Sequence, residues 1–293
     1  MAPQPELLFR ARLGPGETGL VNRVTAEDAG WTDLGVEHWR LARGQTWEIE
    51  TRDLEMVVVL LGGVASARSN RGEWPRIGRR PDVFSGMPYA LYLPRRTSLV
   101  LRVESELLEF ACATAPTDRD HPARLITPDD VAIEHRGGGS NSRQINGIVP
   151  PGFDCHRLVC VEVYTPSGNW SSYPPHKHDE HRVAPDGTLL EADLEEIYLY
   201  KMGRPGAHAV QRVYTGDGSL DAAVTARDGD VVLVPYGYHP VSAAYGYDCY
   251  YVNFLAGSAQ SLACTDDPAH AWVKAEWPPV DPRVPMVTHA MER

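Results

Sequence analysis

The stretch Pro174-Pro175-His176-Lys177-His178 determines how the second half of this chain is interpreted. Histidines two residues apart point to the same side only on an extended chain, because side chains alternate along a strand. The two prolines before them disfavour a helix at this place. His176 and His178 can therefore reach one ion together, and the stretch predicts extended chain with a metal site.

Two later segments contain the residue types that would complete such a site. The run Glu195–Gly203 opens with two adjacent carboxylates, and the run Gly229–His239 ends in a third histidine. Because neighbouring residues of a strand face opposite sides, only one of Glu195 and Glu196 can point toward the histidines. Three neutral imidazoles and one carboxylate suit a divalent first-row transition metal, namely Zn, Mn, Fe, Co or Ni.

Composition and charge narrow the class of protein. The chain has 293 residues, of which 43% are apolar and 23% are charged, as in globular proteins. Its formal net charge of -11 argues against nucleic acid or an anionic membrane as a partner. The longest apolar run, Met56–Ala67, is too short to span a bilayer, and the first residues lack the apolar core of a secretory signal. With five cysteines and no Cys-x-x-Cys pair, these features favour a cytoplasmic protein with free thiols.

Short strand-like runs separated by turn residues dominate the sequence, and long amphipathic helical patterns are nearly absent. The segment Thr127–Ile133 is compatible with a short helix or with a loop. This density of short strands favours an all-β sandwich or barrel. The expected strands are Thr46–Glu50, Met56–Leu61, Tyr89–Leu93, Leu99–Val103, Leu107–Cys112, Leu158–Thr165, Glu196–Lys201, Val210–Tyr214, Asp230–Pro235 and Cys249–Phe254.

The expected strands fall into two groups that parallel each other. Val57–Gly62 parallels Ile197–Gly203, and Phe84–Pro94 parallels Asp228–Pro235, and a duplicated β-barrel explains both parallels. The first group has no His-x-His pair, so we expect the second barrel to bind the metal and the first to be metal-free. The expected parts are an N-terminal barrel at 1–115, a connector at 116–155 and a C-terminal barrel at 156–293.

The second half resembles the cupin superfamily, whose motifs place a His-x-His pair, a Glu and a later His on neighbouring strands. Glu196 stands six residues before Gly203, as in the cupin pattern, which favours it over Glu195 as the ligand. The segment Asp179–Asp193 is an insertion that makes the gap between the histidine pair and this carboxylate longer than usual. The resemblance implies a duplicated cupin fold with the ligand set His176, His178, Glu196 and His239.

A narrower resemblance is to the 5-deoxyglucuronate isomerase family, duplicated cupins of myo-inositol catabolism. It is carried by the segments Gly168–Asp179, Leu194–Tyr198, Gln211–Thr215, Val234–Pro240, Tyr250–Asn253 and Asp267–Trp272. The resemblance implies an aldose–ketose isomerase that converts 5-deoxy-D-glucuronate to 2-deoxy-5-keto-D-gluconate. In such a reaction a metal stabilises the enediolate as a Lewis acid, and a base moves a proton between two carbons.

The identity of the base is left open by the sequence. If Glu196 faces the barrel interior, Tyr198 and Tyr200 share its side by the period of two, although both could simply pack there. Glu195 would also be close if the strand bulges. The catalytic candidates are therefore Glu195, Tyr198, Tyr200 and His208, with Glu162 as a weaker alternative.

A carboxylate on the substrate needs a cationic anchor. Arg143, Lys201 and Arg212 lie in segments that resemble the family. A guanidinium binds a carboxylate through two parallel hydrogen bonds, which favours Arg143 or Arg212 over the lysine. Trp170 and Tyr173 could form an apolar wall beside the deoxy carbon, or could be packing residues.

Two other functions stay open at this point. A site of three histidines and one glutamate that holds Fe or Ni could support dioxygenase chemistry, and a duplicated cupin could bind a sugar acid without catalysis. A related ketol-isomerase that acts on a 4-deoxy uronate could overlap in specificity. In each case the expected partner is a small molecule, and pairing of exposed sheet edges into a homo-oligomer stays open by fold analogy.

Overall fold

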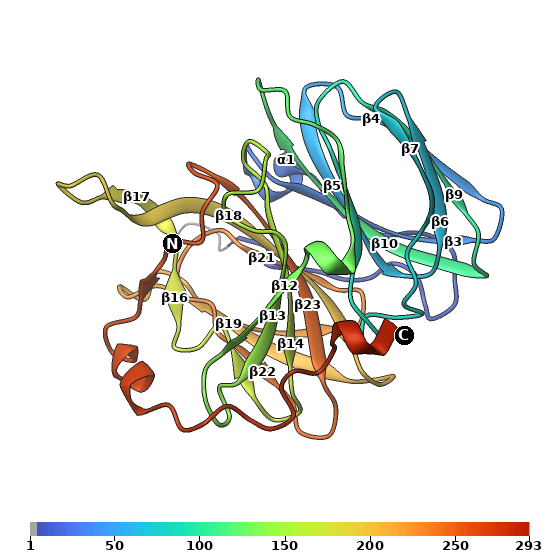
Figure 1. The fold of residues 1–293 in the computed structure, drawn as a ribbon. Coiled ribbons are helices and arrows are strands. Elements are labelled where there is room, and N and C mark those ends of the chain that lie inside the picture. Colours follow the sequence, from blue (N-terminus) through green and yellow to red (C-terminus); the bar gives the residue numbers. More distant parts are fainter. Residues whose placement is uncertain (1–4, 293) are drawn as a thin grey trace.

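The chain folds into an all-β structure with two similar halves (Figure 1). The computed structural model describes residues 5–292. Each half combines a large antiparallel sheet with a four-stranded sheet. The large sheet of the first half contains, in spatial order, β11 (Arg124–Ile126), β8 (Tyr89–Leu93), β5 (Leu54–Gly62), β10 (Leu107–Pro116), β3 (Gly35–Ala42) and β2 (Gly19–Val24). Its smaller sheet contains β4 (Thr46–Glu50), β9 (Ser98–Val103), β6 (Ala65–Ser69) and β7 (Gly72–Ile77).

The second half repeats this arrangement. Its large sheet contains β1 (Leu8–Phe9), β21 (Val231–Val234), β18 (Leu189–Met202), β23 (Cys249–Gly257), β14 (Val159–Thr165), β13 (Arg143–Val149) and β12 (Ala132–Arg136), with β17 (Asp179–Val183) paired to β18. Its smaller sheet contains β15 (Trp170–Ser171), β22 (Val241–Ala243), β19 (His208–Tyr214) and β20 (Asp221–Arg227). A further two-stranded sheet joins β16 (His176–Lys177) to β24 (Thr265–Asp266).

Helices are few and short. They are α1 (Ala26–Ala29) and the 3-10 helices η1 (Pro128–Asp130), η2 (Ala271–Glu276) and η3 (His289–Glu292). Within residues 5–292, no helix has the length and apolar character needed to cross a bilayer.

Three large apolar cores, with a smaller cluster around Leu194 and Leu255, hold the described sheets together. One lies inside the first half around Trp47 and Phe110, and another lies inside the second half around Tyr198 and Tyr251. The third lies between the two large sheets, which pack back to back. It contains Val57, Val59 and Leu61 of β5 and Ile197, Leu199, Val252 and Phe254 of β18 and β23. The central strands of both large sheets, such as β5 and β23, are therefore covered on both faces, which explains why they are solidly apolar in sequence.

The prediction of an all-β, duplicated architecture is confirmed. Each of the ten expected strands is present, and β18 and β10 are longer than predicted. Sequence analysis missed strands with mixed composition, such as β3 and β20. Of the segment Thr127–Ile133, only Pro128–Asp130 is helical, as one turn of 3-10 helix.

The expected connector, residues 116–155, is not an unstructured linker. Its first strand, β11, pairs with β8 of the first half, and its last, β13, pairs with β14 of the second half. Near the N-terminus, β1 pairs with β21 and so belongs to the sheet of the second half. The domain boundaries at residues 115 and 155 stay a prediction. Strand β1, at the start of the first segment, and strand β13, at the end of the connector, both join the large sheet of the second half.

Glu55 and Glu195 occupy corresponding positions in the two halves, and each binds backbone groups of the opposite half. Glu55, at the start of β5, accepts hydrogen bonds from the backbone N–H groups of His156, Arg157 and Leu158 at 2.6 to 2.9 Å. Glu195, on β18, accepts hydrogen bonds from the backbone N–H groups of Thr32, Asp33 and Leu34 at 2.7 to 3.0 Å. Each carboxylate therefore satisfies buried or half-buried donors of the opposite half, which would otherwise lack partners.

We predict that Glu55→Gln lowers the free energy of unfolding by about 2 kcal/mol, because the amide turns an N–H group toward N–H donors that now lack an acceptor. Urea unfolding followed by circular dichroism measures the change. The exposed Glu48 of β4 provides a matched control, since Glu48→Gln should change stability by less than about 0.5 kcal/mol. Equal stability of the two variants would contradict a role for Glu55 in holding the halves together.

Candidate metal centre

Strand β18 organises the site because its alternate side chains face two different cores. Tyr198 and Tyr200 lie in the core of the second half, whereas Ile197 and Leu199 lie in the core between the large sheets. By the same alternation Glu196 points into the second half and the neighbouring glutamate points toward the first half.

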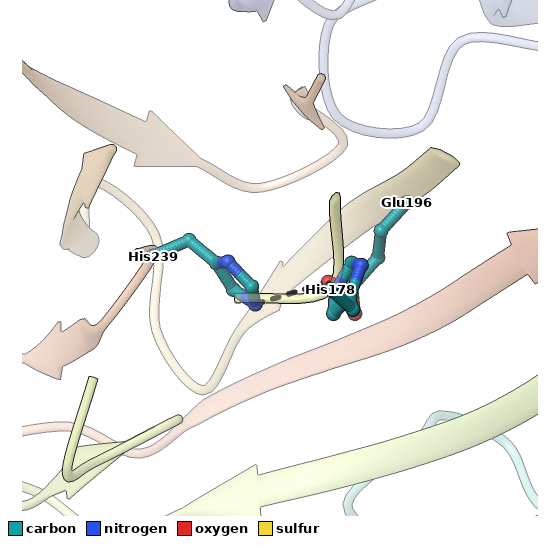
Figure 2. Close-up of side chains that lie close together, drawn as sticks. All are labelled: His178, Glu196 and His239. Carbon is teal, nitrogen blue, oxygen red and sulfur yellow. Dashed lines mark hydrogen bonds and ion pairs between the residues drawn. The ribbon is translucent and has the colours of Figure 1, made fainter. Parts of the chain in front are cut away.

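Three of the predicted ligands converge inside the second half (Figure 2). His178 follows β16, Glu196 lies on β18, and His239 lies in the loop between β21 and β22. Their ligand atoms all lie within 4.8 Å of one another. Nε2 of His178 is 2.9 Å from Oε2 of Glu196, and Nε2 of His239 is 3.2 Å from the same oxygen.

His176 stands beside this group, at a slightly greater distance. Its ring centroid is 4.8 Å from that of His239 and 6.4 Å from that of His178. It is only partly buried, whereas the other three residues are buried. The fourth predicted ligand is therefore next to the cluster but outside the set whose ligand atoms lie within 4.8 Å.

Backbone carbonyls orient all three imidazoles in the same way. Nδ1 lies 3.4 Å from the carbonyl oxygen of Pro174 in His176, 3.1 Å from that of Leu194 in His178, and 2.9 Å from that of Gly237 in His239. A carbonyl can only accept, so each Nδ1 carries a proton, and Nε2 is the nitrogen left to face the cluster. Metal-binding histidines normally have their other ring nitrogen held by a hydrogen bond in this way.

The electrostatics of the cluster also suit a cation. Nε2 of His239 is fully buried and makes no hydrogen bond, despite its closeness to Glu196. Burial favours the neutral acid of Glu196, but the adjacent imidazoles of His178 and His239 hold its pKa well below the usual range. Burial also lowers the pKa of His176 well below its usual range. The cluster thus offers imidazole nitrogens and a carboxylate, and the residues present fit a divalent first-row metal.

Asn253 is a site residue that sequence analysis did not identify as one. Its Nδ2 donates a 2.6 Å hydrogen bond to Oε1 of Glu196, which fixes the orientation of the carboxylate and leaves Oε2 toward the histidines. Asn253 lies on β23 directly opposite Tyr198 of β18, so both side chains point to the same interior. The segment Tyr250–Asn253 carries the family resemblance in sequence, and the cross-strand register shows that Asn253 contacts Glu196.

A cavity of about 280 Å³ opens beside the cluster. Its lining includes Arg143, Ser172, Tyr173, His176, His178, Glu196, Tyr198, Tyr251 and Asn253. Of the predicted substrate residues, Arg143 and Tyr173 therefore border the cavity. Trp170 is 38% exposed and contacts Tyr173 at 5.5 Å between ring centroids, outside the cavity lining.

Arg143 is a buried arginine without a carboxylate partner among the described residues. Its Nη1 donates hydrogen bonds to the backbone oxygens of Asn141 and Tyr173, at 3.2 and 3.0 Å. Burial lowers the pKa of its guanidinium to about 10, so it stays charged at neutral pH. A buried cation that lacks an anionic partner is costly, and an anionic ligand in the cavity would offset this cost.

Two predicted site residues on β18 are directed away from the cavity. The carboxylate of Glu195 is occupied by backbone N–H groups of the first half. Lys201 Nζ forms ion pairs with Glu109 and Asp228, each at 2.9 Å. Odd-numbered residues of β18 face away from the interior of the second half. Glu195 and Lys201 are therefore not part of the candidate site, contrary to the prediction from the sequence.

Three further candidates are also outside the cavity lining. His208 is the first residue of β19, and its Nδ1 is 3.0 Å from the Tyr247 hydroxyl. Arg212 forms two hydrogen bonds with Asp221 on the exposed side of the small sheet. The weaker alternative Glu162 faces the first half and pairs with Arg80. Tyr200 is likewise not among the residues that line the cavity: it points to the interior of the second half, and its hydroxyl donates to Gln211 Oε1.

The corresponding positions in the first half hold other residue types. In the register of β5 against β10, Met56 stands where Glu196 stands in β18 against β23, and Cys112 stands where Asn253 stands. Both line a cavity of about 740 Å³, and no histidine is among the described residues that line it. That the first half is metal-free stays a prediction, and it is supported by Met56 and Cys112 standing where the second half has Glu196 and Asn253.

Comparison with known proteins identifies the family. The model of the KduI/IolB family matches residues 7–273. The chain is 45% identical over 260 residues to the 5-deoxy-glucuronate isomerase of Geobacillus thermodenitrificans, covering 88% of this chain and 93% of that protein. It is 36% identical over 256 residues to the enzyme of the same name from Bacillus subtilis strain 168, covering 87% and 92%. The chain belongs to the KduI/IolB family, and it is an isomerase.

Solved structures support the fold in the same way. An IolB-like protein from Salmonella typhimurium LT2 superposes with a TM-score of 0.85 at 38% identity, covering 92% of this chain and 99% of that chain. Oxalate decarboxylase of Bacillus subtilis, a protein with Mn(II) centres, gives a TM-score of 0.61 at 12% identity, covering 91% and 80%. The second likeness shows the fold alone, and it confirms the prediction of a duplicated cupin.

We predict that His178→Ala and His239→Ala reduce the bound metal to about a tenth of the wild-type content or less, because each removes a buried nitrogen ligand. Inductively coupled plasma mass spectrometry of protein purified without added metal measures the content. His208→Ala should retain the wild-type content, since its ring contacts Tyr247 away from the cluster. Unchanged metal in the first two variants would show that the ion binds elsewhere.

Proposed function

We propose that this isomerase converts 5-deoxy-D-glucuronate to 2-deoxy-5-keto-D-gluconate, an aldose–ketose isomerisation in inositol catabolism. The relatives that carry this name cover most of the chain at 33% to 45% identity. The single observation that carries the proposal is the cavity that combines the histidine–glutamate cluster with a buried arginine that lacks a carboxylate partner. The cluster suits a carbonyl and hydroxyl pair of a substrate, and Arg143 suits its carboxylate.

The proposed metal ligands are His176, His178, Glu196 and His239. A divalent first-row ion bound there would supply Lewis-acid stabilisation of the negative charge that develops on the substrate oxygens. Asn253 holds the carboxylate of Glu196 in place, and the backbone carbonyls hold the three imidazoles, so the ligands are oriented before the ion binds.

Arg143 is the proposed anchor for the substrate carboxylate. Its guanidinium is charged, buried and on the cavity wall, and its remaining N–H groups are free of carboxylate partners among residues 5–292. A substrate with a carboxylate at the far end from its aldehyde is thereby held with the aldehyde toward the histidines.

Tyr198 is the proposed proton donor to the substrate. Tyr198 lines the cavity, and its ring centroid is 6.1 Å from that of His239. Burial raises its pKa well above the usual value, so the phenol keeps its proton at neutral pH. A protonated phenol beside the cluster can donate to an oxygen that gains negative charge.

The reaction is tested by NMR of 5-deoxyglucuronate in D2O with the purified protein. We expect the aldehyde signal to be replaced by ketone product, and we expect a chelator to abolish the conversion by removing the Lewis acid. The conversion should proceed equally under anaerobic conditions, because isomerisation consumes no oxidant. Absence of product with metal-replete protein would refute the proposed reaction, and a requirement for oxygen would favour dioxygenase chemistry.

We predict that Arg143→Gln raises KM for 5-deoxyglucuronate about 10- to 100-fold, because one charge-assisted contact to the carboxylate is lost. Steady-state kinetics measures the change. Arg212→Gln is the matched control, since Arg212 is paired with Asp221 outside the cavity, and its KM should stay within about twofold of wild type. An equal effect of both substitutions would rule out Arg143 as the anchor.

A further inference from the structure

Ser172 has an unusual backbone conformation at the cavity wall. Its φ is 49°, in the left-handed region that residues with a Cβ atom rarely adopt. Four non-glycine residues in the described part of the chain have a positive φ, and the other three, Arg52, Arg76 and Arg96, are exposed. Ser172 is buried and borders the same cavity as the histidine–glutamate cluster. Strained residues that are kept in buried sites commonly have a functional reason.

The hydroxyl of Ser172 lies between two buried phenols. Its Oγ is 3.1 Å from the Tyr198 hydroxyl and 3.5 Å from the Tyr251 hydroxyl. The two tyrosine rings are 4.8 Å apart between centroids, and both line the cavity. Tyr251 interacts electrostatically with Arg143, whereas Tyr198 lies near His239. The three hydroxyls therefore form a short row, Tyr198–Ser172–Tyr251, whose residues all line the cavity.

A serine hydroxyl has a single proton, so it can donate to one of the two phenols while it accepts from the other. The phenol that accepts keeps its own O–H free to point into the cavity. The phenol that donates to Ser172 has its proton directed away from the substrate. Ser172 thus orders the two phenols, which without it would have no common partner.

We propose that Ser172 is a positioning residue of the isomerase, whose hydroxyl sets which of Tyr198 and Tyr251 donates a proton to the substrate. This inference rests on the proposed function. During isomerisation the aldehyde oxygen gains a proton and the neighbouring hydroxyl oxygen loses one. The phenol that gives its proton to the first oxygen is restored by the proton that the second releases, directly or through the row, so no proton is consumed overall.

Because the backbone of Ser172 is left-handed, its hydroxyl can be removed without destabilising the protein. Glycine is the residue that fits a φ of 49° best, so Ser172→Gly removes the hydroxyl and relieves the backbone at once. We predict that this variant keeps or raises Tm and lowers kcat about tenfold, with KM within about twofold of wild type. Ser172→Ala should show the same loss of kcat with a lower Tm than the glycine variant.

Arg96→Gly is the matched control for backbone relief. Arg96 has a φ of 57° and lies exposed in the first half, so this substitution should keep or raise Tm without changing kcat. Wild-type kcat in Ser172→Gly would overturn the proposal. A fall in kcat accompanied by a fall in Tm and in metal content would also overturn it, because the serine would then be structural.

A double-mutant cycle tests whether the serine acts through the phenols. Tyr251→Phe is expected to lower kcat, and adding Ser172→Gly should lower it further by much less than the single serine substitution does in wild type. The same comparison is made with Tyr198→Phe. Multiplicative effects in both cycles would show that Ser172 acts independently and would overturn the proposal. If wild-type protein itself forms no product, the proposed reaction has failed, whereas an active wild type with an equally active glycine variant refutes only the role of Ser172.

Discussion

The alternation of side chains along β18 is the constraint on which the rest of the structure depends. Its even-numbered residues, Glu196 and Tyr198 among them, face the interior of the second half, where Glu196 joins the candidate metal centre. Its odd-numbered residues, such as Glu195 and Ile197, face the first half and hold the two large sheets together. A shift of pairing by one residue would exchange the two sets, so the packing of the sheets and the placement of the site are fixed by the same register.

The duplicated fold uses equivalent strand positions for shared and for separate purposes. Glu55 of β5 and Glu195 of β18 perform the same task, since each accepts backbone N–H donors of the opposite half. One residue further, the halves diverge: the second has Glu196, and the first has Met56. The glutamates that face the opposite half are thus the same in β5 and β18. The next residues, which face the interior of their own half, differ: β18 has a carboxylate there, and β5 has an apolar side chain.

The first half also supports the site from behind. Arg80, which follows β7, is buried and donates hydrogen bonds to both carboxylate oxygens of Glu162 on β14, at 3.0 and 3.2 Å. The hydroxyls of Tyr164 and Tyr250 bind the same carboxylate. Separating the halves would leave this charge without its partner in an apolar core, which is strongly unfavourable. The strands β14 and β23, whose opposite faces border the cavity, are therefore held rigidly by a half that lacks the histidine cluster.

The sequence by itself determined the strands, the duplication and the histidine pair, because β-branched runs, turn residues and the period of two act locally. The tertiary structure alone decided which charged residues belong to the site. Lys201 and Arg143 are both cationic side chains. Lys201 is paired with Glu109 and Asp228, whereas the hydrogen bonds of Arg143 in the described residues go to backbone oxygens. Likewise Asn253 and Ser172 join the site through contacts with Glu196 and Tyr198. The physical reason is that charge pairing and cross-strand register depend on strands distant in sequence, which no local pattern records.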